Sequence, residues 1–230
     1  MLDFSRFDYL SFDCYGTLID WESGILGYLR PLLRSKGCDA SDGQLLNLYS
    51  ECEPRQQDLS YRSYREILNS VMRDFGHKFH VDFTGAEVSG LADSIRGWEP
   101  FSDTVPALRR LKSRYKLAVL SNIDDDLFAF TAPKLGVKLD ALVTAQQAQG
   151  YKPSLRNFEL LLERLSIDQS RLLHVAESLY HDVVPARALG IATVWVNRRQ
   201  GKPAAATRMA AAVPDIEVPT VASLAEIAVL

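Results

Sequence analysis

The chain has 230 residues, of which 47% are hydrophobic and 24% charged, and its formal net charge is −3. Its acidic and basic residues are interspersed and its apolar runs are short, which argues against a nucleic-acid-binding face and against a membrane span. No apolar leader core stands at the amino terminus, and Cys14, Cys38 and Cys52 form no CxxC pair, so we expect a cytoplasmic protein.

The first predicted element is a short apolar strand over residues 7–13. Between residues 21 and 96 the pattern changes, because apolar residues recur at helical spacing, as in Tyr64, Ile67, Leu68 and Val71. Glycines stand where helices are expected to end, at Gly37, Gly76 and Gly97. The pattern therefore predicts an all-helical block directly after the first strand.

From residue 98 onward the predicted helices and strands alternate. Helices are predicted over 104–115, 124–135, 154–165 and 183–189, and strands over 116–120, 141–144, 172–176 and 191–196. This alternation predicts an α/β fold with a Rossmann-like core, in which a parallel sheet carries helices on both faces. A Pro/Ala-rich stretch at 201–206 is predicted to be a surface loop.

The position of the helical block suggests how the chain divides into domains. A block that follows the first strand is expected to cover the carboxyl edge of the sheet, where open α/β folds bind ligands. We therefore expect an α/β core domain formed by residues 1–18 and 98–230, and an inserted all-helical cap domain formed by residues 19–97.

Polar side chains follow four of the predicted strands, in chain order Asp13, then Ser121 and Asn122, then Lys152, then Glu177, Ser178 and Asp182. Each of them alone is most often a turn, helix-cap or surface residue. Strand ends on one side of a parallel sheet converge, however, so the joint pattern predicts one cleft that holds carboxylates, an ammonium group, a hydroxyl and an amide.

Four motifs carry a resemblance to a known family: FDCYGTLID at 12–20, LSN at 120–122, YKP at 151–153 and AESLYHD at 176–182. Together they resemble the haloacid dehalogenase-like hydrolase superfamily. The resemblance implies the same core and inserted helical cap. It also implies that Asp13 is a nucleophile that attacks the substrate and becomes a covalent ester during turnover.

Tyr15 bears on which branch of the superfamily the chain resembles. Phosphatases of this superfamily carry Asp-x-Asp in the first motif, and the second Asp protonates the leaving oxygen; here Tyr15 takes that position. A poor leaving group needs such an acid, whereas halide leaves as a stable anion. The motif therefore resembles that of the 2-haloacid dehalogenases, with Tyr15 as a wall of the substrate pocket, because a phenol is a weak acid at neutral pH.

The dehalogenase resemblance implies a role for each site residue and requires no cofactor. Asp13 displaces halide from C2 of a small 2-haloacid, and water then hydrolyses the ester. Lys152 is expected to keep the pKa of Asp13 low. Thr17, Ser121 and Lys152 would hold the Asp13 oxygens and the substrate carboxylate, Asn122 would contact halide, and Asp182 would position or activate the water.

The match is incomplete at several positions. Glu177 and Leu179 stand where the dehalogenases carry Ser and Asn, and Phe158 stands where they carry Tyr. Their cap arginine has no clear counterpart, and the candidates for it are Arg55, Arg62 and Arg65, which on the alternative interpretation are solvated helix charges. Ser178 and His181 are further candidate substrate contacts, although a histidine at such a place is more often a surface residue.

Two alternatives remain open. AESLYHD also resembles the phosphatase pattern Gly-Asp-Ser-x-x-Asn-Asp, so Asp13, the Tyr15 carbonyl, Glu177 and Asp182 could hold Mg²⁺ in a phosphatase that acts on a small metabolite. A catalytically silent binding module is the third hypothesis, and the intact set of site residues argues against it. The expected partners are a small anionic substrate and water, with a homodimer as a further option.

Overall fold

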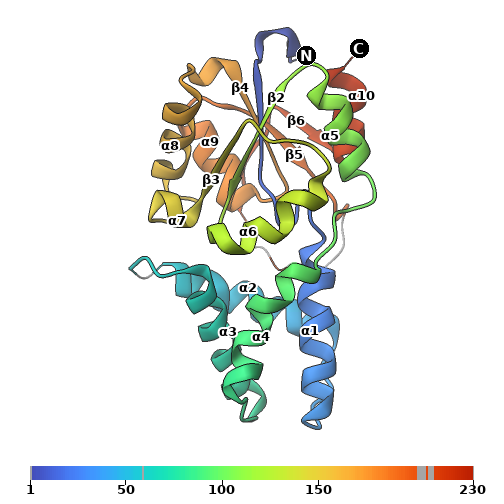
Figure 1. The fold of residues 1–230 in the computed structure, drawn as a ribbon, viewed down its shortest axis with the longest axis vertical. Coiled ribbons are helices and arrows are strands. Elements are labelled where there is room, and N and C mark those ends of the chain that lie inside the picture. The colour runs from blue at the N-terminus through green and yellow to red at the C-terminus, as the bar shows by residue number, and fades with distance from the viewer. Residues whose placement is uncertain (1, 59, 201–205, 207–209, 230) are drawn as a thin grey trace.

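The computed structural model describes residues 2–58, 60–200, 206 and 210–229. Within these residues six strands form one parallel sheet in the order β3-β2-β1-β4-β5-β6 (Figure 1). The strands are β1 Tyr9–Phe12, β2 Lys116–Ser121, β3 Ala141–Thr144, β4 Leu172–Ala176, β5 Ala192–Val196 and β6 Ile216–Val218. The predicted α/β fold with a parallel sheet is confirmed.

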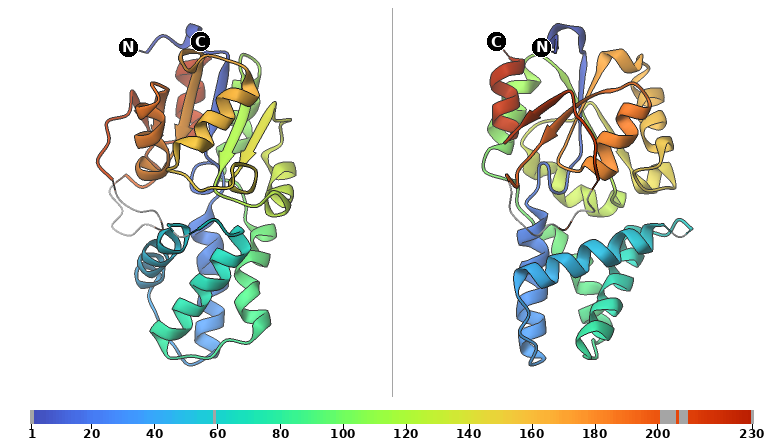
Figure 2. Two further views of the ribbon diagram at one scale, coloured as in Figure 1. Left: turned by 90° about the vertical axis from the view of Figure 1, so that its left-hand side faces the viewer. Right: turned by 180° about the vertical axis from the view of Figure 1, so that it is seen from behind.

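Helices cover both faces of this sheet (Figures 1 and 2). Alternate residues of β2 face the two layers: Leu117 and Val119 join the core beneath α5 and α10, while Ala118 and Leu120 join the core beneath α8 and α9. The helices of this part are α5 Thr104–Lys112, α6 Asp125–Thr131, α7 Ala145–Ala148, α8 Leu155–Leu165, α9 Val184–Ala188 and α10 Val221–Ala228.

Four helices lie beyond the carboxyl edge of the sheet (Figure 1). They are α1 Trp21–Ser35, α2 Asp42–Gln57, α3 Tyr64–Phe79 and α4 Gly85–Ser94, and we call them the helical block. The last three begin in the same way, because Ser41, Ser63 and Thr84 each form a reciprocal capping box with the residue three positions on. Local sequence therefore sets where these helices start.

The chain enters and leaves the helical block through two segments that lie side by side. The Asp20 N–H donates to the Glu99 carbonyl at 2.9 Å, and the Phe101 N–H donates to the Leu18 carbonyl at 3.1 Å. Gly24 of α1 sits against the ring of Trp98, where a Cβ atom would lie only 2.5 Å from ring carbons. These contacts fix the direction in which the block leaves the sheet.

Asp124, which lies in the sheet-bearing part of the chain, also anchors the helical block at the start of α3. Asp124 accepts hydrogen bonds from the backbone N–H groups of Tyr64 (2.8 Å) and Arg65 (3.0 Å) at the start of α3. The helical block is thereby held over the sheet edge from two directions.

None of the helices in the described part of the chain is long and apolar enough to cross a membrane. The surface loop predicted at 201–206 lies outside the described residues except for Ala206. Strand β6 and helix α10 had no counterpart among the predicted elements. Strand β6 is only three residues long, so it gives no periodic signal.

Candidate active site

Asp13 lies directly after β1, between β2 and β4 in the middle of the sheet. Its backbone N–H donates to the Val175 carbonyl at 3.0 Å, which continues the β1–β4 ladder by one residue. The chain then turns sharply, with Gly16 at a φ of +97° that favours glycine. The turn brings Thr17 back, so that its hydroxyl donates to Asp13 Oδ2 at 2.7 Å.

Lys152 is the cation of the site. Its side chain is almost fully buried, and its Nζ donates to Asp13 Oδ1 (2.8 Å), to Asp182 Oδ1 (2.7 Å) and to the Leu120 carbonyl (3.0 Å). Asn122 holds the segment in place, because its amide accepts from the Lys152 N–H (2.7 Å) and donates to the Lys152 carbonyl (3.1 Å). The predicted halide contact, Asn122, is therefore first of all a support for Lys152.

Asp182 is held from two sides. It lies in a single π-helical turn, Leu179–Val183, a distortion that often occurs at functional sites. Besides Lys152, His174 of β4 contacts its Oδ1 through Nε2 at 2.9 Å, and the other ring nitrogen of His174 lies 2.8 Å from the Ser11 hydroxyl. Asp182 Oδ2 is buried without a hydrogen-bond partner in the described residues.

One buried cation thus serves two buried carboxyl groups, and their pKa values move in opposite directions. Burial raises the pKa of Asp13, and the charge of Asp182 adds to this although Lys152 opposes it. Burial acts against the charged form of Asp182 too, but Lys152 and His174 together lower its pKa. The expectation that Lys152 would keep the pKa of Asp13 low is wrong, because burial, together with the charge of Asp182, raises this pKa by more than Lys152 lowers it.

The pKa of Lys152 is raised above its ordinary value. Burial alone would lower it, but the carboxylates of Asp13 and Asp182 outweigh burial and raise it. Lys152 therefore stays charged at neutral pH.

These groups open onto a small cavity between the sheet edge and the helical block. Its volume is about 40 Å³, far below that of pockets for drug-sized ligands. Ser121 lines it with a buried hydroxyl that has no partner in the described residues. The lining residues are Asp13, Tyr15, Trp21, Glu53, Tyr64, Ser121, Asn122, Lys152, Ser178, His181 and Asp182. The cavity suits a small molecule that accepts hydrogen bonds.

Tyr15 forms part of the cavity wall. Its hydroxyl is hydrogen-bonded to Thr131 at 2.7 Å, and the edge of its ring packs at 79° to Trp98. Burial raises the pKa of Tyr15 well above that of a free phenol. The residue at the position of the phosphatase acid is thus both engaged elsewhere and a weak proton donor.

The arginines predicted to bind substrate do not reach this cavity. Arg55 is exposed on α2 and pairs with Asp74, while Arg62 bonds to Ser70 and Gln56. Arg65 pairs with Asp93 and Asp126. Arg65 thus reaches across to α6, but none of the three arginines is among the described residues that line the cavity, so the predicted arginine contact to substrate is not found there.

The predicted magnesium ligands do not come together as a set. Asp13, Tyr15 and Asp182 line the cavity, but Glu177 is not among the lining residues in the described part of the chain. Its backbone takes a structural role, since its N–H donates to Thr17 Oγ1 and its carbonyl accepts from Trp195. The described residues contain no cluster of three or more His, Cys, Asp or Glu arranged to hold a metal ion.

Ser178 and His181, the other predicted contacts, do line the cavity. The Ser178 hydroxyl accepts from the His181 N–H at 3.0 Å and so caps the π-helical turn.

The sequence interpretation missed His174 and Glu53 as residues of the site, besides Trp21 and Tyr64 of the cavity wall. His174 is a polar residue inside the apolar strand 172–176, which is itself a signal of a buried polar contact. Glu53 continues the buried stripe of α2 formed by Leu45 and Tyr49 at intervals of four residues. An acid on such a stripe must be buried, and here it lies at the cavity.

His174 gives a first prediction. Replacing His174 with Leu removes one hydrogen-bond partner of Asp182 Oδ1 and the imidazole partner of the Ser11 hydroxyl. We therefore expect a loss of about 2 kcal/mol in unfolding free energy and a loss of about 10-fold in kcat. Urea unfolding and turnover measure the two effects. The exposed His77, changed to Leu in the same way, is the control. Unchanged stability of the His174 variant would contradict the assigned contacts.

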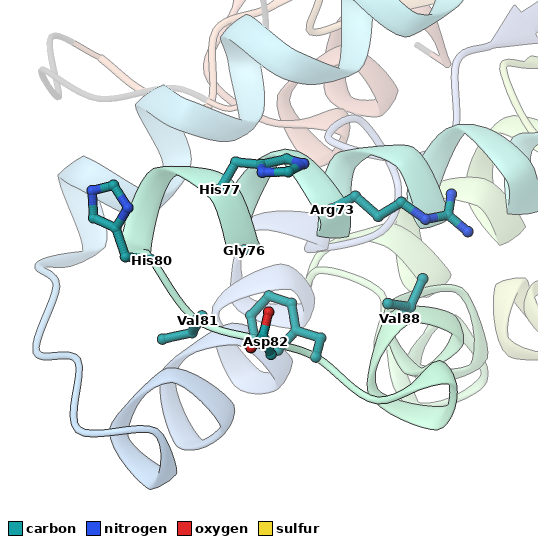
Figure 3. Close-up of a pocket in the computed structure, with 8 residues that line it drawn as sticks. Arg73, Gly76, His77, His80, Val81, Asp82 and Val88 are labelled. Carbon is teal, nitrogen blue, oxygen red and sulfur yellow. The ribbon is translucent and has the colours of Figure 1, made fainter.

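A larger hollow of about 430 Å³ lies at the end of the helical block remote from the sheet (Figure 3). It is open to solvent and is formed by the end of α3 and the turn that follows, with Arg73, His77, His80 and Asp82 along it. No described nucleophile faces it, so the chemistry belongs to the smaller cavity.

The matching family model identifies the chain. It describes a haloacid dehalogenase-like hydrolase and covers residues 7–190, which include every predicted catalytic residue. The chain belongs to this family of hydrolases. It is therefore an enzyme of the haloacid dehalogenase-like family, and its α/β fold is the one that the motifs imply.

Known members resemble it along most of its length. An (S)-2-haloacid dehalogenase of Pseudomonas sp. strain YL is 30% identical over 82% of either chain. A glyceraldehyde 3-phosphate phosphatase of Methanothermobacter thermautotrophicus is 25% identical over 63% of this chain and 70% of its own. The crystal structure of an L-2-haloacid dehalogenase of Xanthobacter autotrophicus superposes with a TM-score of 0.80 over 96% of this chain and 98% of that one, at 19% identity. The haloacid dehalogenase-like fold is thus shared although few residues are.

Proposed function

We propose that this hydrolase releases halide from small 2-haloacids, with Asp13 as the nucleophile. The observation that carries the proposal is Tyr15, whose hydroxyl is bound to Thr131 at the place where a phosphatase acid would stand. Without a proton donor at that place, the leaving group must be a stable anion such as halide. The similarity to (S)-2-haloacid dehalogenases supports the same substrate class.

The first step is an in-line displacement. An oxygen of Asp13 bonds to C2 of the substrate while the carbon–halogen bond breaks, and the electron pair leaves with the halide. Lys152 and Thr17 orient the carboxylate by binding one oxygen each. The unpartnered Ser121 hydroxyl is free to donate to the substrate carboxylate.

The second step hydrolyses the ester. Water adds to the carboxyl carbon of Asp13, the 2-hydroxy acid departs and Asp13 regains its carboxylate, with one proton released. The free Oδ2 of Asp182 is placed to accept a hydrogen bond from that water. Its lowered pKa makes Asp182 a group that positions water as an anion.

In this proposal the helical block is a cap. It supplies Trp21, Glu53 and Tyr64 to the cavity and closes it from the side opposite the sheet. A closed site protects the ester from side reactions and strengthens the charge interactions within it.

A substrate panel tests the function. We expect halide release from chloro- and bromo-substituted acetate and propionate, with the rate unchanged by a metal chelator. Absence of halide release across the panel would refute the proposal. Halide-selective electrodes or ion chromatography measure the product.

A phosphatase is the second candidate, because one relative carries that activity. The same panel therefore includes small phosphate esters, with and without Mg²⁺. Phosphate release that depends on Mg²⁺, in the absence of halide release, would favour this candidate over the first.

A further inference from the structure

Among the described residues, Glu53 is the one carboxyl group that the helical block contributes to the lining of the cavity. It lies on α2, the helix that runs along the face of the block toward the sheet edge (Figures 1 and 2). Its side chain is 4% exposed, and no cation is bonded to it among the described residues. A buried carboxyl group without a cation beside a reaction site calls for a functional explanation.

The hydrogen bonds of Glu53 are one-sided. Oε1 accepts from the Tyr64 hydroxyl at 3.2 Å and from the Gln57 amide. The Tyr49 and Tyr64 hydroxyls lie 3.0 Å apart, so Tyr49 can donate to Tyr64 and complete a chain that runs toward Glu53. Oε2 has no hydrogen-bond partner in the described residues. A proton on Glu53 therefore belongs on Oε2, where it is free to be donated.

The geometry of displacement determines what that oxygen can meet. Asp13 attacks from the sheet side of the cavity, and the leaving group departs on the opposite side of the carbon. The lining residues away from the sheet are Trp21, Glu53 and Tyr64. Of these, Tyr64 already donates to Glu53, so Glu53 Oε2 and the indole N–H of Trp21 are the polar groups that can meet the departing group, and of these two only Glu53 titrates.

We infer that protonated Glu53 donates a hydrogen bond to the departing halide, and so sets the preference for halides that accept hydrogen bonds strongly. This inference rests on the proposed dehalogenase function. The C–O bond to Asp13 forms as the carbon–halogen bond breaks, the halide takes the electron pair, and the proton stays on Glu53. The halide then leaves as an anion and Glu53 is ready for the next turnover.

Charge and burial agree with a neutral Glu53. Burial raises its pKa to about 7, although Tyr64 and Gln57 oppose this. The titratable and charged groups that face it or share the cavity are, on the helical block, Tyr49, Asp58 and Tyr64, and, from the sheet side, Asp13, Tyr15, Tyr151, Lys152, His181 and Asp182. The ammonium group of Lys152, the one lysine in this set, pairs with Asp13 and Asp182 and not with Glu53. An ionised Glu53 would repel both the anionic substrate and the halide.

The sign of the pH dependence follows. Below about pH 7 Glu53 carries its proton and can donate, and above that pH the proton is lost. Burst-phase halide release, which reports the displacement step, should therefore fall as pH rises through about 7. If ionised Glu53 instead bound a cationic substrate, the rate would rise over the same range.

Two variants of Glu53 and one matched control test the inference. Glu53→Gln keeps an N–H donor but cannot titrate, so the decline above about pH 7 should disappear. Glu53→Ala removes the donor, and we expect burst-phase chloride release to fall by about 10- to 100-fold, the effect of one hydrogen bond to a charged partner, with a smaller fall for bromide. Glu51→Gln, an exposed glutamate on the same helix, should keep the wild-type profile.

The outcomes separate this inference from the function on which it rests. If the wild-type protein releases no halide from any haloacid, both fall together. If it releases halide and Glu53→Gln retains the wild-type pH profile, the role of Glu53 is refuted and the dehalogenase function stands. If Glu53→Ala does not fold, the Glu53→Gln profile alone decides, because that variant retains the bonds to Tyr64 and Gln57.

Discussion

Asp13→Asn is expected to abolish halide release, by at least about 10⁴-fold in kcat, because an amide oxygen is a poor nucleophile. The same substitution should raise the stability of the protein. Burial and the charge of Asp182 raise the pKa of Asp13, so its ionised form is disfavoured in the folded state. A neutral side chain of the same shape removes that cost, and we expect a gain of roughly 1 kcal/mol, or about 2–4 °C in Tm.

The gain should depend on pH in a definite sense. A raised carboxyl pKa means that folding takes up protons, so the cost is present at neutral pH and disappears as pH falls below the unfolded value of 3.8. Thermal unfolding of both proteins between about pH 4 and about pH 8 measures this difference. If Asp13→Asn is less stable than the wild type at neutral pH, the attraction between Asp13 and Lys152 stabilises the fold by more than the burial of the Asp13 charge destabilises it.

Two further measurements test the role of Asp13 as the nucleophile. Asp39→Asn, an exposed aspartate on the helical block, is the matched control and should change neither activity nor Tm. In a single turnover in heavy-oxygen water, the hydroxyl of the product should carry ordinary oxygen, because it comes from the Asp13 carboxylate. Label in the product after one turnover would instead mean that water attacks the substrate directly.

The fold could be predicted from the sequence because its signals are local. Strands β1 to β5 are short apolar runs, and the helical block shows helical spacing with caps at its helix starts. Strand β6 has three residues and pairs only with β5 at the sheet edge, so its position depends on a tertiary contact that no local pattern records.

The site could be predicted only in its sheet-derived half. Asp13, Lys152 and Asp182 follow strands, and the topology of a parallel sheet brings strand ends together whatever the details of packing. Residues of the helical block reach the cavity through the way that α2 lies against the sheet edge. That placement depends on tertiary contacts such as those of Asp124 with the start of α3. The sequence alone therefore could not show which charged residue of the block, an arginine or Glu53, would line the cavity.

The shared cation is the second feature with a large expected effect. Lys152→Met replaces the side chain with an uncharged one that matches its aliphatic stem, and it leaves Asp13 and Asp182 buried together without a positive charge. Removing one partner of a buried ion pair costs about 3–5 kcal/mol, which for a chain of this size is about 10 °C in Tm. One of the two carboxyl groups should then hold a proton at neutral pH, and because Asp13 must be ionised to attack, kcat should fall by at least about 10³-fold.

The pH dependence of this loss distinguishes the network from simple packing. Asp182 has a lowered pKa in the folded state, so its stabilising contribution is present above the unfolded value of 3.8 and is lost as pH falls. Lys152 has a raised pKa, so its contribution is present below the unfolded value of 10.5 and is lost as pH rises. The stability gap between wild type and Lys152→Met should therefore be widest between these values and should narrow as pH falls below 3.8. Lys138→Met, an exposed lysine, should show no gap. A gap independent of pH in Lys152→Met would mean that the loss comes from altered packing at this position and not from the missing charge.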